Sequence, residues 1–102
     1  MEIYHLTVHV QPTEENPRVR EIKGAYVACW VKAPTADQAR AIAFADIVSG
    51  PWLIDMTEEP PSAPIAISER TEDNAQYLHQ AQLDGECYVY HTYSAEDEPT
   101  TH

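Results

Sequence analysis

The chain has 102 residues, which is enough for one domain with a single hydrophobic core. Apolar residues make up 43% of the chain, a composition that is typical of a globular protein. Asp and Glu number 17 against six Lys and Arg, so the formal net charge is -11. Because binding to a phosphate backbone needs clustered cations that displace counterions, this balance argues against a nucleic-acid partner.

The location of the protein can be predicted from what the sequence lacks. No basic segment followed by an apolar run stands near residue 1, and no stretch approaches the ~20 apolar residues of a membrane-spanning helix. Two cysteines, Cys29 and Cys87, do not make a disulfide framework. We therefore expect a cytoplasmic protein with reduced thiols and no membrane partner.

The first half of the chain predicts three strands and a helix. Residues 2–10 and 25–32 alternate between apolar and polar positions, as half-buried strands do, and the segment between them reads as a long loop. Thr35 is suited to be the N-cap of a helix, because Gln38 can complete a capping box with it. This helix should end at about Val48, and residues 52–56 alternate again as a third strand.

The second half predicts one more helix and one more strand. A helix is expected over residues 71–83, with Ser68 or Thr71 as its N-cap. Gly85 can adopt a left-handed conformation and end this helix, and residues 86–93 then form the last strand.

These elements predict an α+β fold with the order strand, strand, helix, strand, helix, strand. The simplest packing is a two-layer sandwich, in which both helices lie on one face of a four-stranded sheet. Residues 1–94 then form a single domain, and residues 95–102 form an acidic tail that we expect to be disordered. The order of the strands in the sheet does not follow from the sequence.

Motifs for common chemistries are missing from the sequence. With three glycines in the chain, neither a phosphate-binding loop nor a dinucleotide-binding turn can be built. The CxxC spacing of structural zinc sites does not occur, and Cys29 and Cys87 alternate with apolar residues, where thiols are usually inert. We therefore predict no catalytic residue, no cofactor and no enzymatic activity.

The histidines are the one pattern that suggests a metal site. His5 and His9 share one face of the first strand, but the strand rise places them about 13 Å apart. Cys87 and His91 have the same separation on the last strand. A metal ion would need neighbours from two strands, such as His5 or His9 beside His91. Since the sequence cannot place them together, we predict no metal site.

Aromatic and amphipathic side chains favour a contact surface on the sheet. If the helices cover the face that carries Val27 and Val31, these side chains gather on the other face. They are His5, Thr7, His9, Tyr26, Ala28, Trp30, Tyr88 and Tyr90. Exposed aromatic residues of this kind are typical of interfaces, in a homodimer or with another protein. Two alternatives remain open: the long loops cover this face, or the last strand presents its other side there.

Two segments resemble those of small uncharacterised bacterial α+β proteins. The first is AYVACWVKAPTADQARAIAFADI with a tryptophan soon after it, and the second is AQLDGECYVYHTY near the carboxyl end. This resemblance covers roughly half of the chain and implies no catalytic residue. In size and charge the chain is also similar to immunity proteins, which bind and block a toxin. We expect a self-associating or protein-binding module; the alternative is an immunity protein that binds a basic toxin through its acidic surface.

Overall fold

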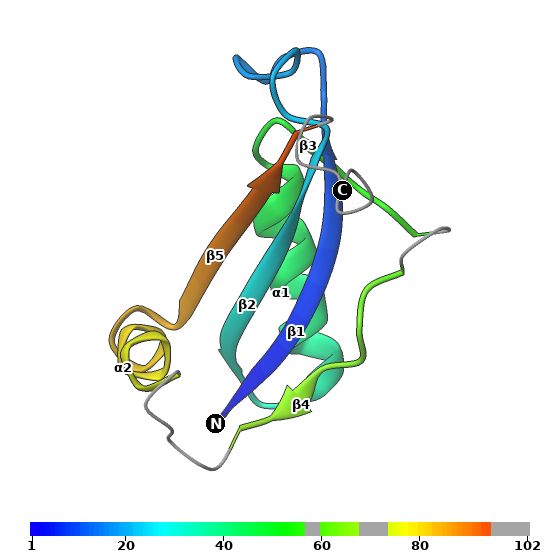
Figure 1. Ribbon diagram of the computed structural model, residues 1–102. Helices are drawn as coiled ribbons and strands as arrows, with labels where there is room; N and C mark the ends of the chain where they lie inside the picture. The colour runs from blue at the N-terminus through cyan, green and yellow to red at the C-terminus, as the bar shows by residue number, and fades with distance from the viewer. Residues whose placement is uncertain (57–59, 68–73, 95–102) are drawn as a thin grey trace, which may run out of the picture.

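The computed structural model describes residues 1–56, 60–67 and 74–94. Its elements are β1 (Glu2–Pro12), β2 (Gly24–Ala33), α1 (Ala36–Val48), β3 (Trp52–Ile54), β4 (Ile65–Ala66), α2 (Ala75–Asp84) and β5 (Glu86–Tyr93) (Figure 1). The α+β class is confirmed, and β4 is one strand more than the sequence predicted.

The sheet has the strand order β3-β1-β2-β5, and β4 pairs with β1 as well. The four pairings among the described strands are all antiparallel. Because β2 and β3 are both antiparallel to β1, they run parallel to each other on its two sides. The chain passes from one to the other through α1, which makes this connection a crossover.

One face of the sheet packs against α1. The alternation of β1 places Leu6, Val8 and Val10 on this face, where they are fully buried. The helix contributes Ala39, Ala43 and Ile47, which recur every four residues and so form one stripe.

The predicted N-cap of α1 is confirmed. The backbone N–H of Gln38 donates to Thr35 Oγ1 at 3.2 Å. This hydrogen bond satisfies one of the helix donors that have no partner within the helix itself.

The two helices lie on opposite faces of the sheet, so the prediction of both helices on one face is wrong. Leu78 and Ala81 of α2 pack with Ile3 of β1 and Trp30 of β2. Ile3 and Trp30 alternate along their strands with the residues that face α1, and therefore point the other way. The physical reason is that this second face also carries large apolar side chains, which need a cover of their own. Figure 1 shows α2 at the end of the sheet where β5 begins.

β3, Ser62 and β4 cover the outer edge of β1. β3 pairs with the end of β1, and β4 pairs with its start. Between them the N–H of Thr7 donates to Ser62 Oγ at 2.8 Å, and the N–H of Ser62 donates to the Thr7 carbonyl at 3.0 Å. In the part of the chain that the structure describes, no strand lies beyond β5 at the opposite edge.

Some predictions fall on residues outside the described ranges. These are Ser68 and Thr71 as N-caps and the tail at 95–102. The end of α2 is described: Gly85 has φ of 87°, and its left-handed conformation is confirmed. Among the helices that the structure describes, none has the length and apolar content needed to cross a bilayer.

Candidate functional site

The residues of the predicted interface are divided between the two faces of the sheet. On the face that α2 partly covers lie His5, Thr7, His9, Tyr26, Ala28 and Trp30. Tyr88 pairs with Cys29 and Tyr90 with Val27, so both tyrosines point toward α1. The prediction that all these residues share one face is wrong, because the register between β2 and β5 places Tyr88 and Tyr90 on the other side.

Trp30 is a core residue beneath α2. Its ring centroid lies 4.5 Å from that of Tyr77 in a stacked arrangement, and the residue is 8% exposed. The His5 ring lies 4.7 Å from Trp30, and its Nδ1 is 3.0 Å from the carbonyl oxygen of Cys29. This part of the predicted interface therefore packs within the molecule. The element that covers it is α2, not one of the long loops.

At the other end of the same face, His9 lies between a carboxylate and a phenol. Its Nδ1 is 3.0 Å from Asp55 Oδ2, and its Nε2 is hydrogen-bonded to the hydroxyl of Tyr93. In neutral imidazole, Nδ1 then carries the proton and donates to Asp55, while Nε2 accepts from Tyr93. The Tyr26 ring packs 4.8 Å from His9.

This chain of polar groups is largely withdrawn from solvent. The side chains of His9 and Asp55 are 8% and 7% exposed. A buried carboxylate and imidazole stabilise the fold only when they are paired and hydrogen-bonded, as they are here. Sequence reasoning missed Asp55 and Tyr93, because they lie 46 and 84 residues from His9 and no local pattern links them.

The histidines are not brought together for a metal ion. Tyr26 pairs with His9 on one side and with His91 on the other, so it separates the two imidazoles across the sheet. Within residues 1–56, 60–67 and 74–94 there is no group of three His, Cys, Asp or Glu side chains that could hold a metal.

On the α1 face, two acidic side chains share one phenol. The hydroxyl of Tyr88 donates to Asp46 Oδ2 at 2.6 Å and lies 3.2 Å from Glu86 Oε2. The hydrogen bond with Asp46 is the largest cause that raises the pKa of Glu86, followed by burial. The pKa of the Tyr88 phenol is also raised, first by burial and then by its hydrogen bond to Asp46.

The thiol beside this group is held in its protonated form. Burial raises the pKa of Cys29 to about 12, and the charge of Asp46 adds to this effect. The thiolate is the reactive form of cysteine, so burial and the charge of Asp46 both disfavour reaction at Cys29. The pKa of Cys87 is raised as well, first by burial and then by Asp84.

The outer edge of β5 presents backbone hydrogen-bonding groups. Lys32 N–H donates to the Gly85 carbonyl at 2.8 Å. In the register of β2 with β5, Gly85 and every second residue after it therefore direct their backbone groups toward β2. Because inward and outward groups alternate in an antiparallel pair, the N–H and C=O of Tyr88, Tyr90 and Thr92 point away from β2.

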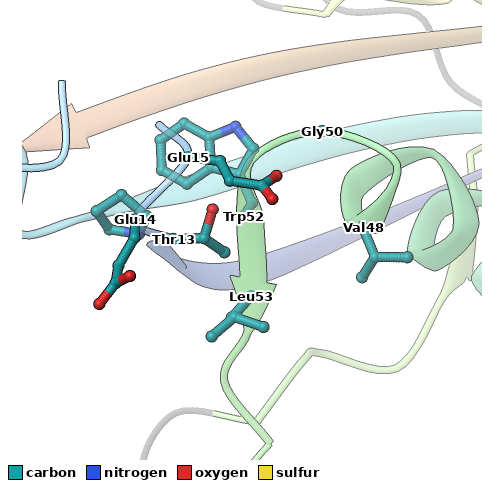
Figure 2. A pocket seen from close by; sticks show the side chains of 8 residues that line it. Thr13, Glu14, Glu15, Val48, Gly50, Trp52 and Leu53 are labelled. Carbon is teal, nitrogen blue, oxygen red and sulfur yellow. The ribbon is translucent and has the colours of Figure 1, made fainter. Parts of the chain in front are cut away.

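A hollow lies where the chain leaves β1 and where it enters β3. Figure 2 shows the side chain of Glu14 on one side of it and that of Val48 on the other, with the side chains of Glu15, Trp52 and Leu53 between them. Its volume is about 600 Å³.

The surroundings of the hollow combine apolar groups with acidic ones. Leu53 is 61% exposed and Val48 is 54% exposed, and both glutamates are exposed. Thr13 also lines the hollow, and its buried Oγ1 has no hydrogen-bond partner within the described chain. No local pattern in the sequence predicts this site, because its lining comes from two separate turns.

Comparisons with known proteins identify no relative. No protein-family model matches the sequence, no curated protein matches it, and no solved structure matches the fold. The resemblance to small bacterial α+β proteins therefore stays a prediction.

Proposed function

We propose that this protein is a non-enzymatic module that forms a homodimer by antiparallel pairing of β5 with β5 of a second copy. The observation that carries this proposal is the uneven cover of the two sheet edges. The outer edge of β1 is paired with β3 and β4, and Ser62 binds it between them, whereas no described strand lies beyond β5. An open strand edge is a template for pairing with another strand.

The sequence of β5 supports the proposal. It reads ECYVYHTY, which is rich in residues that favour strands. It contains neither the proline nor the lysine that proteins commonly place on exposed edges, and its register with β2 runs without a bulge. β5 is therefore suited to pair along most of its length.

The proposed pairing is centred on Tyr90, which lies opposite Tyr90 of the second copy. Tyr88 then lies opposite Thr92, and each of these pairs exchanges both backbone hydrogen bonds across the edge. On the other face, Val89 lies opposite His91. This register brings no like charges together and places tyrosine against tyrosine, an aromatic cross-strand pair of the stabilising kind.

The test is a pair of substitutions at Thr92, whose side chain is exposed and whose N–H points outward. Thr92→Pro removes only an N–H that β2 does not use, so the monomer should keep its fold while the dimer dissociates. Thr92→Ala keeps the N–H and should remain dimeric. Light scattering at micromolar concentration measures the mass, against 11.5 kDa for one chain.

Circular dichroism and thermal unfolding provide the control that Thr92→Pro is folded. The proposal is wrong if the natural sequence stays monomeric on concentration. It is also wrong if a folded Thr92→Pro variant is as dimeric as Thr92→Ala.

A further inference from the structure

We propose that the hollow beside Trp52 is a docking site for a basic segment of a partner protein. In this arrangement an arginine or lysine stem lies along Trp52 and Leu53, and its charged end reaches Glu14 and Glu15. The proposal goes beyond the homodimer, because it concerns a different surface and a different partner.

The lining of the hollow fits the two chemically different parts of such a side chain. The hydrocarbon stem of arginine or lysine is apolar and packs favourably on exposed groups such as Leu53 and Val48. The guanidinium or ammonium group is attracted to the face of a tryptophan ring and to carboxylates. Trp52 and the two adjacent glutamates supply both kinds of contact around one space (Figure 2).

The chemistry of the hollow selects a basic partner over an acidic or neutral one. Glu14 and Glu15 are exposed on its rim, and the described residues that line it include no lysine or arginine. The whole chain carries a formal charge of -11, so a cationic partner is attracted from a distance while an acidic one is repelled.

A protein segment fits the hollow better than a small free amine does. Val48 and Leu53 are more than half exposed, so they extend the apolar surface beyond the space that one cation would fill. Neighbouring apolar side chains of a partner segment would cover them.

The probe for the test is a synthetic peptide in which arginine and leucine alternate, and a glutamate–leucine peptide is its control. Binding is followed by the NMR amide shifts of Glu15, Gly50 and Leu53, which line the hollow. The arginine peptide should shift these amides, and the glutamate peptide should not.

Matched double variants test whether the hollow itself binds. Glu14→Gln with Glu15→Gln should weaken peptide binding by about tenfold. The control is Glu2→Gln with Asp37→Asn, which changes the net charge equally. Glu2 and Asp37 lie where β1 and α1 begin, whereas it is the carboxyl ends of β1 and α1 that reach the hollow. This control should weaken binding by less than about twofold, because exposed charges more than ~10 Å away are screened at 0.1 M salt.

A third variant, Leu53→Ser, should also weaken binding, because it removes the exposed apolar wall. Thr92→Pro should bind the peptide as well as the natural sequence does, which separates this proposal from the homodimer. Equal losses in the two double variants would overturn the proposal, as would unchanged binding by Leu53→Ser. Equal affinity for free arginine amide would overturn the docking of a segment.

Discussion

The ring of Tyr93 lies so close to Gly24 that no other residue fits at position 24 without a shift. A β-carbon there would lie 2.8 Å from Cζ of Tyr93 and 2.9 Å from the carbonyl oxygen of Val10. The absence of a side chain therefore lets Tyr93 lie across the end of β2, where its hydroxyl meets His9. Gly24 is a packing requirement of the His9 hydrogen-bond chain.

Gly24→Ala should destabilise the protein by about 2 kcal/mol, the usual cost of forcing extra volume into a packed site. Urea unfolding measures the change in the free energy of unfolding. The control is Gly50→Ala, whose added β-carbon would have its nearest neighbours at 3.5 Å, an ordinary contact distance. The packing argument fails if the two variants lose the same stability.

Local patterns predicted most of the elements but not their mutual placement. The cap at Thr35 and the left-handed Gly85 depend on nearby residues, so the sequence was sufficient for both. The face of β5 depends on its register with β2. With tyrosines on both of its faces, β5 has no contrast of polar and apolar positions that could reveal that register.

The candidate sites were harder to predict for the same physical reason. Asp55, directly after β3, lies 46 residues from His9 of β1, and the hollow is lined by two unrelated turns. Both depend on β3 lying beside β1, and the strand order is a property of the whole fold. The face of the sheet on which α2 packs likewise depends on the burial of Ile3 and Trp30, which come from two different strands.

Glu86→Gln should stabilise the protein at neutral pH. The pKa of Glu86 is raised in the folded protein, chiefly by its hydrogen bond with Asp46, so its proton is bound more tightly when the chain is folded. The folded state therefore loses stability as the pH rises through the ordinary pKa of a glutamate, about 4.3, toward the raised value. The glutamine side chain of the Glu86→Gln variant does not ionise, so the variant does not lose stability in this way.

Thermal unfolding at about pH 7 and about pH 4 tests the expectation for Glu86. The gain from Glu86→Gln should be present at the higher pH and shrink at the lower one. Glu21→Gln, on an exposed carboxylate paired with Arg18, is the control and should give no such gain. A gain of equal size at both pH values would contradict the explanation by proton binding.

The two thiols should differ in reactivity. Cys29 is fully buried and its pKa is raised to about 12, whereas Cys87 is only half-buried. A thiol reagent at about pH 8 should therefore label Cys87 slowly and leave Cys29 untouched in the folded protein, since both burial and a raised pKa lower the thiolate fraction. In denaturant both thiols should react. A Cys87→Ser variant that is still labelled when folded would contradict this expectation.

Salt should act in opposite directions on the two proposed contacts. Each copy of the chain carries a formal charge of -11, so two copies repel each other, and the β5 pairing must form against this repulsion. Raising the salt from about 0.05 M to about 0.5 M shortens the range of charge interactions and should tighten the homodimer.

The same change should weaken binding of the arginine–leucine peptide, because that contact depends on attraction to Glu14 and Glu15. Sedimentation equilibrium measures the first effect, and the NMR amide shifts of Glu15, Gly50 and Leu53 measure the second. The double variant Glu14→Gln with Glu15→Gln should lose most of the salt dependence of peptide binding while its dimer still tightens with salt. If salt shifts both equilibria in the same direction, the assignment of dimerisation to a low-charge strand edge and of peptide binding to an acidic hollow is wrong.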